Sequence, residues 1–266
     1  MQLPIPIKKE KYEPIPPLIG EAADYNTYFP TFQEKVGWFL IGMIVSGAVL
    51  WIFYENIFVS VIVGAIGGIC FVPIRRKQKI AKRQKLLTIQ FRSLLDALAT
   101  SIGAGRNIFE SFSGAAGDLA VQFTEDSDIV REVQLIQVGM NHNIRIEDLL
   151  LNFAARSGVE DVFNFANVFA TCYKKGGNIK EVIKNTASII GDKIEIQMEL
   201  ETMVAGQKNE QNILLVMPVI FIVLMKSMGG ELIDLKSPMG ILAVSIAIVI
   251  FIASYFVSKK ILDIKL

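Results

Sequence analysis

The sequence predicts an all-α membrane protein with four transmembrane helices and a cytoplasmic antiparallel helical bundle of about six helices inserted between the two pairs. Apolar segments at 36–54 and 57–74, and again at 212–229 and 239–257, are each about as long as a helix that crosses the ~30 Å hydrocarbon core. Residues 75–211 between them are polar and repeat apolar side chains every three or four positions, without a strand pattern.

The first 35 residues form a proline-rich arm, which holds six of the nine prolines. Proline fixes φ and lacks a backbone donor, so a regular helix is unfavourable here. Two interpretations stay open for the arm: a disordered tail, or an extended segment that docks through apolar side chains. Those side chains are Ile5, Ile7, Ile15, Leu18, Ile19, Tyr25, Tyr28 and Phe29.

The membrane segments fall into two domains, 36–74 and 212–257, and cations predict their orientation. A basic stem at 75–85 carries seven cations in eleven residues directly after the second span. These cations are Arg75, Arg76, Lys77, Lys79, Lys82, Arg83 and Lys85. The tail at 258–266 is also basic, whereas the two outer connections carry only Lys236 as a cation. The prediction is a multi-pass protein of the cytoplasmic (inner) membrane with both termini cytoplasmic.

The basic stem is also expected to attract anionic lipid. The rest of the polar domain, from 86 to 211, has 11 basic and 17 acidic residues. This acidic body would repel phosphate, so nucleic acid is not an expected partner.

The first helices of the polar domain follow from apolar stripes. One stripe ends before Gly103-Ala104-Gly105, and a short helix through 108–112 is expected to loosen at Gly114 and Gly117. Further stripes at 129–140 and 146–153 predict two more helices, separated by a turn at 141–143.

The last two helices have clearer ends. A stripe at 162–173 is expected to stop at Gly176-Gly177, and Asn178 is a candidate N-cap with Glu181 three residues later. No proline follows until Pro218, so the sixth helix is predicted to run unbroken into the third span and to kink there.

Residues able to carry catalysis are scarce. The only histidine, His142, lies in a predicted turn, and no Cys/His cluster has metal-ligand spacing. Phosphate-binding glycine loops and a nucleophile elbow are also missing from the sequence. The sequence therefore predicts a protein that is not an enzyme and needs no cofactor.

Small residues in the spans predict close helix packing. Gly64, Gly67 and Gly68 could pack within the chain or against another membrane helix, including a substrate helix. Pro218 and Lys226 are further candidates for such contacts. Lys226 is the one ionisable residue inside a predicted span, and either snorkels to the interface or meets a buried partner.

Two groups of motifs resemble the type II secretion F domain of inner-membrane platform proteins. Leu94-Leu95-Asp96-Ala97-Leu98-Ala99 precedes Gly103-Ala104-Gly105, and Gly176-Gly177-Asn178-Ile179 with Glu181-Val182 follows about seventy residues later. A long charged helix then ends in Leu215-Val216-Met217-Pro218. The resemblance covers about residues 85–225, and the layout of spans is most similar to tight-adherence (Flp) pilus platform proteins.

This resemblance implies a platform subunit that couples a hexameric secretion or pilus ATPase to extraction of prepilin or pilin subunits. Longer members carry two copies of the domain, so this chain would pair with itself or with a sibling platform protein. The candidate ATPase contacts are turn residues: Gly105, Arg106, Asn107, Lys174, Lys175, Gly176, Gly177 and Asn178. The alternatives are a component of a membrane transporter and a membrane-anchored scaffold with a partner-binding bundle.

Overall fold

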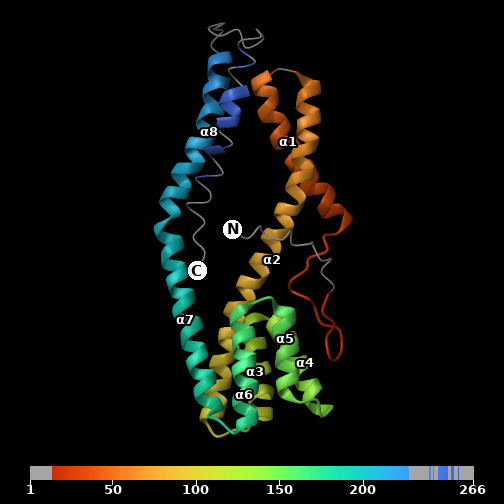
Figure 1. The fold of residues 1–266 in the computed structure, drawn as a ribbon, viewed down its shortest axis with the longest axis vertical. Coiled ribbons are helices and arrows are strands. Elements are labelled where there is room, and N and C mark those ends of the chain that lie inside the picture. Colours follow the sequence, from red (N-terminus) through yellow and green to blue (C-terminus); the bar gives the residue numbers. More distant parts are fainter. Residues whose placement is uncertain are drawn as a thin grey trace, which may run out of the picture. The chain divides into compact units, whose positions relative to one another are not determined.

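The computed structural model describes residues 14–54 and 56–227, and beyond them residues 240, 242, 245–250, 253, 254 and 257. Its named elements are all helices, and the described residues contain no strand, which confirms the all-α class for them (Figure 1). The helices are α1 (Phe32–Tyr54), α2 (Ile57–Gly103), α3 (Ile108–Phe123), α4 (Asp128–Asn141), α5 (Ile146–Ser157), α6 (Glu160–Lys175), α7 (Ile179–Met203) and α8 (Ala205–Ser227).

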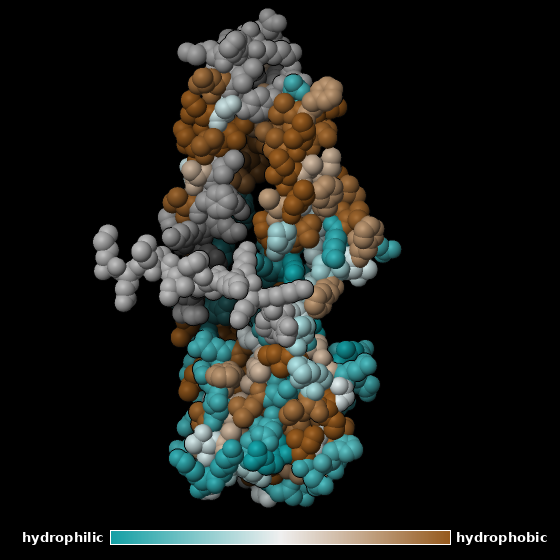
Figure 2. Space-filling model, turned by 45° about the vertical axis from the view of Figure 1, so that its right-hand side comes forward, coloured by the Kyte–Doolittle hydropathy of each residue, from teal (hydrophilic) through white to brown (hydrophobic). Residues whose placement is uncertain are grey.

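The chain divides into two compact units. We call residues 14–28 with 79–192 the polar unit, and residues 29–78 with the described residues from 193 onward the apolar unit. On the face that Figure 2 shows, the first unit carries hydrophilic side chains with hydrophobic patches between them, and hydrophobic side chains cover most of the second.

Three helices in the described part are long and apolar enough to cross a membrane: α1, α2 and α8. They fall on the first three predicted spans. The fourth predicted span, 239–257, is described only in part, and the tail at 258–266 lies wholly outside the described residues.

The second predicted span does not end where the apolar residues end. Helix α2 continues through Pro73 and the basic stem to Gly103, a length of 47 residues. That this span and the following stripe form one helix was not predicted from the sequence. A proline removes only one backbone donor from the helix, and the Lys, Arg, Gln and Leu residues that follow are good helix formers.

The core of the polar unit is built around one face of α2. Phe91 lies at a ring-centroid distance of 5.5 Å from Phe165 on α6 and 6.2 Å from Phe153 on α5. The apolar residues of α2 at the same face are fully buried: Leu87, Leu94, Leu95 and Leu98. The stripes predicted from helical spacing thus form the buried faces of α2, α5 and α6.

Helix α3 is longer than expected. Gly114 and Gly117 lie inside it, and it ends only at Phe123. A capping box at its start and the buried side chains Phe112, Ala115 and Leu119 stabilise the helix across both glycines. Packing of this face outweighs the helix cost of about 1 kcal/mol per glycine.

The sixth predicted helix is interrupted once, so the expectation of an unbroken helix was wrong in detail. Helices α7 and α8 are separated by Val204 alone, two residues before Gly206, and glycine lowers helix propensity. Backbone bonds from Val204 N to Leu200 O and from Lys208 N to Val204 O, both 3.0 Å, keep the helical pattern across the join. Pro218 lies within α8, and the kink expected there stays a prediction.

Candidate functional site

The two predicted contact turns lie at the same end of the polar unit (Figure 1). A Cβ atom added at Gly103, the last residue of α2, would lie 3.7 Å from Cε and Nζ of Lys180, in the first turn of α7. The structure therefore brings together residues more than seventy positions apart in the sequence. The predicted contact residues are all exposed: Gly105, Arg106, Asn107, Lys174, Lys175, Gly176, Gly177 and Asn178.

Glycine and asparagine have structural roles in these turns. Gly105 and Gly176 adopt positive φ of 86° and 72°, where a side chain would be strained. The Asn107 side chain accepts a hydrogen bond from Glu110 N at 2.8 Å, and Asn178 accepts one from Glu181 N at 3.2 Å. The predicted cap at Asn178 is thereby confirmed.

The remaining side chains give the turns a cationic surface. Arg106, Lys174, Lys175 and Lys180 are exposed, whereas the nearby Glu110 and Glu181 belong to the helix caps. Cations also suit the C-terminal end of α6 because the helix dipole is negative there. We call Arg106, Lys174, Lys175 and Lys180 the cationic end; its chemistry fits an acidic partner surface.

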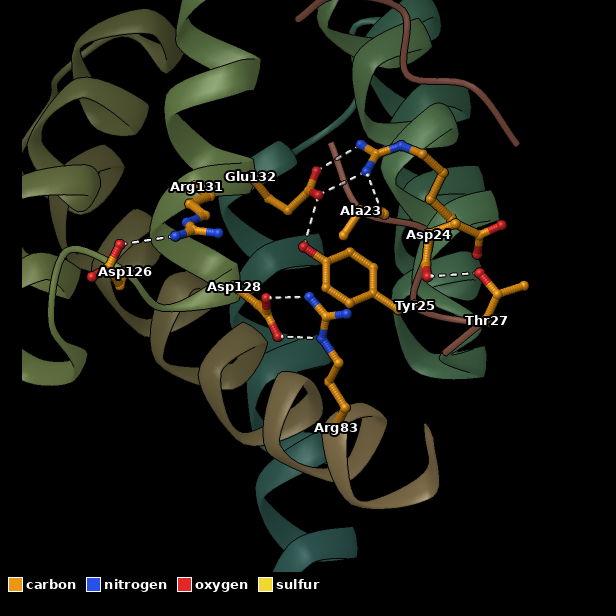
Figure 3. A network of polar contacts seen from close by, with 10 residues as sticks. Ala23, Asp24, Tyr25, Thr27, Arg83, Asp126, Asp128, Arg131 and Glu132 are labelled. Atoms are coloured by element: carbon orange, nitrogen blue, oxygen red, sulfur yellow. Dashed lines mark hydrogen bonds and ion pairs between the residues drawn. The ribbon is translucent and has the colours of Figure 1, made fainter. Parts of the chain in front are cut away.

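A buried ionic cluster, which the sequence did not predict, lies within the polar unit. The guanidinium of Arg156 on α5 donates to both carboxylate oxygens of Glu132 on α4, at 2.7 and 2.6 Å. Their side chains are 4% and 1% exposed. The Tyr25 hydroxyl donates to the same carboxylate at 2.8 Å (Figure 3). A buried charge pair with this many hydrogen bonds is strongly damaged by loss of one partner.

The cluster fastens the N-terminal arm to the helices. Tyr25 N donates to Arg156 O at 2.9 Å, and Arg156 donates to Ala23 O at 3.1 Å. The Asn26 side-chain amide donates to the carbonyls of Ala155 and Arg156, both at 3.2 Å. Of the two interpretations left open for the arm, residues 14–28 therefore adopt the docked one; residues 1–13 lie outside the described part.

One cation of the basic stem belongs to this cluster. Arg83 forms a two-pronged ion pair with Asp128, at 2.8 and 2.6 Å, and its guanidinium lies 4.5 Å from the Tyr25 ring centroid (Figure 3). Its assignment as a lipid contact needs correction, since its charge is used inside the protein; its contribution to membrane topology stays a prediction. Helical spacing alone could not reveal a partner 45 residues away.

Burial of the Tyr25 hydroxyl, reinforced by the negative charges of Glu132 and Asp128, raises its pKa well above the ordinary range. A tyrosine in the unfolded chain ionises near pH 10. The stability gained from the neutral hydroxyl is therefore complete below about pH 10 and is lost as the pH rises above that value.

We expect the free energy of unfolding of the detergent-solubilised chain to fall above about pH 10, by up to ~1.4 kcal/mol per pH unit. Tyr25→Phe should remove most of this slope, because the buried hydroxyl at position 25 is then absent. Tyr173→Phe, at an exposed tyrosine of α6, is the control and should keep the slope. Equal slopes in wild type and Tyr25→Phe would contradict the assignment.

The predicted membrane-contact glycines pack within the chain. A Cβ atom at Gly64 would lie 3.1 Å from Met43 O, and one at Gly68 would lie 2.7 Å from Phe39 O. A Cβ at Gly67 would overlap the Ser46 hydroxyl, which itself donates to Gly42 O. These three glycines therefore serve the contact between α1 and α2, and this face is not open to another membrane helix. The Lys226 side chain lies outside the described atoms.

The chain matches no known protein family, no curated protein and no solved structure. Among the described residues, no three His, Cys, Asp or Glu side chains lie together so that they could hold a metal ion. The candidate site is thus defined by the cationic end and by the cluster that holds the arm.

Proposed function

We propose that this protein is a platform subunit of the cytoplasmic membrane that couples a hexameric assembly ATPase to extraction of pilin-like helices from the bilayer. In this proposal the polar unit is a cytoplasmic antiparallel bundle that receives the movement, and the apolar unit passes it to the filament subunits. Pairing with a second copy or with a sibling platform protein would complete the platform.

One observation carries the proposal: the chain crosses between the two units three times, and two of these crossings lie inside helices. The crossing at 28–29 precedes α1, whereas the crossing at 78–79 is within α2 and the crossing at 192–193 is within α7. A helical connection transmits displacement and torque better than a flexible linker, because its backbone hydrogen bonds continue across the junction. This supports mechanical coupling over a tethered scaffold.

The membrane segments favour this proposal over transport. The apolar stretches 36–54 and 57–74 contain no Asp, Glu, Lys, Arg or His. A transporter path needs polar or ionisable groups near the middle of the membrane. Spans of this kind instead suit close contact with other apolar helices.

The cationic end is the proposed ATPase contact. We expect Lys174→Glu combined with Lys175→Glu to weaken co-purification of the hexameric ATPase roughly tenfold or more, because like charges would then face each other. Arg131→Glu combined with Lys82→Glu makes the same charge change at exposed positions away from the cationic end and should leave recovery intact. Normal ATPase recovery and normal filament assembly with the first variant would contradict the proposal.

A further inference from the structure

Arginines and aromatic rings meet where the apolar part of α2 ends. The Arg75 guanidinium carbon lies 4.9 Å from the ring centroid of Phe71, and that of Arg76 lies 5.9 Å from the ring centroid of Phe29. Phe29 precedes α1, so this contact links the beginning of α1 to α2 within the apolar unit. Phe29 and Phe32 are 75% and 77% exposed.

The charge around these residues is positive. Lys35 in the first turns of α1 and Lys77 on α2 are both exposed. The nearest acidic residue in sequence, Glu34, accepts a hydrogen bond from Thr31 N at 3.1 Å at the start of the same helix. Arg75 also donates to Gln78 at a long 3.4 Å, which leaves most of its donors available.

We propose that Arg75 and Arg76 bind the phosphate of an anionic membrane phospholipid, with Phe29 and Phe32 seated at the boundary between headgroups and acyl chains. A guanidinium presents a planar fork of donors that matches phosphate, and it is weakly hydrated. An aromatic ring beneath a guanidinium holds the fork in place while its N–H edges stay open. On segments that lie at a membrane surface, phenylalanine rings bury into the boundary between headgroups and acyl chains.

The arrangement goes beyond a signal for membrane orientation. Orientation depends on the number of cations near the membrane and not on their geometry. Here two arginines are placed over rings that come from different segments of the chain. Arg83 differs from Arg75 and Arg76, because it forms an ion pair with the carboxylate of Asp128 inside the protein.

The test is native mass spectrometry of the full chain released from nanodiscs made of equal parts phosphatidylglycerol and phosphatidylcholine. Wild type should retain phosphatidylglycerol in preference. Arg75→Gln with Arg76→Gln should lower that retention about tenfold, as two cations near an anionic surface are lost. Arg131→Gln with Lys184→Gln removes the same charge from the polar unit and should retain lipid like wild type.

A second variant separates lipid binding from orientation. Arg75→Lys with Arg76→Lys keeps both charges, so the orientation of the chain in the membrane should stay unchanged. Labelling of cysteines from each side of the membrane measures this orientation. It should still retain less phosphatidylglycerol than wild type, because an ammonium group lacks the planar fork.

Three results would overturn the proposal. The first is equal retention by wild type and the glutamine variant, and the second is wild-type retention by the lysine variant. The third is displacement of phosphatidylglycerol from wild type by millimolar inorganic phosphate, which would identify free phosphate as the ligand.

Discussion

Replacing Arg156 by methionine is expected to destabilise the polar unit by about 3–5 kcal/mol. The Glu132 carboxylate would stay buried with only the Tyr25 hydroxyl as a hydrogen-bond donor among the contacts described. Desolvation of an unpaired carboxylate is costly, and the arm would also lose the bond from Arg156 to Ala23 O. Chemical denaturation of the full chain in detergent, followed by far-UV circular dichroism, measures this change.

The chain provides a matched control at another arginine of the same helix region. Arg145 pairs with Asp148 at 2.8 Å, but both side chains are partly exposed, at 63% and 39%. Exposed pairs contribute about 0–1 kcal/mol, so Arg145→Met should have a small effect.

A triple variant, Tyr25→Phe with Glu132→Leu and Arg156→Met, should recover much of the stability lost in Arg156→Met. It removes the buried charge together with its partners. A loss at Arg156 no larger than the loss at Arg145 would contradict the account of the cluster.

Gly68→Ala is expected to destabilise the α1 and α2 hairpin by about 1–3 kcal/mol. The new methyl group would lie 2.7 Å from the backbone oxygen of Phe39 and 2.8 Å from its ring, so the two helices would have to move apart. The only tryptophans of the chain, Trp38 and Trp51, both lie in α1, and their fluorescence during denaturation in SDS reports this contact.

Gly37→Ala is the control for this substitution. Nothing lies within 4 Å of a Cβ atom at Gly37, which is also in α1. The change should leave the hairpin equally or slightly more stable, because alanine favours a helix by up to ~1 kcal/mol over glycine. If Gly68→Ala behaved like Gly37→Ala, the close packing of α1 and α2 would be wrong.

Helical periodicity and glycine turns could be predicted from the sequence because they are local. The stripe through Phe91, Leu94, Leu95 and Leu98 and the stop at Gly176 rest on spacing and on one backbone angle. The join of the second span to the next helix was missed because Pro73 and a change in polarity suggest a boundary. A helix can nevertheless continue across such a change, because its backbone hydrogen bonds form equally well beside polar and apolar side chains.

The ionic cluster could not be predicted because its members come from four segments: the arm, α2, α4 and α5. Two signals were nevertheless present. Glu132 lies on the same helical face as the apolar Ile129, Val133 and Ile136, and Arg156 follows Phe153 on the buried face of α5. A charged residue on an apolar stripe indicates a buried partner, but the sequence does not say which one.

The contact turns were predicted individually, but their proximity follows from topology. Helices α3 to α6 return the chain so that the ends of α2 and α6 meet. The docked arm adds contacts to α2, α4 and α5 that no local pattern indicates. The cationic end therefore forms only in the folded polar unit, where the two turns lie together.

The most direct measurement places a photocrosslinking amino acid at position 106 or 175 of the full chain in membranes that contain the assembly ATPase. The account predicts a crosslink to the ATPase from both positions. It predicts none from position 121, because Val121 is 91% exposed but lies about 21 Å along α3 from Asn107. Absence of an ATPase crosslink from both 106 and 175, or equal crosslinking from 121, would contradict the claim that the cationic end binds the ATPase.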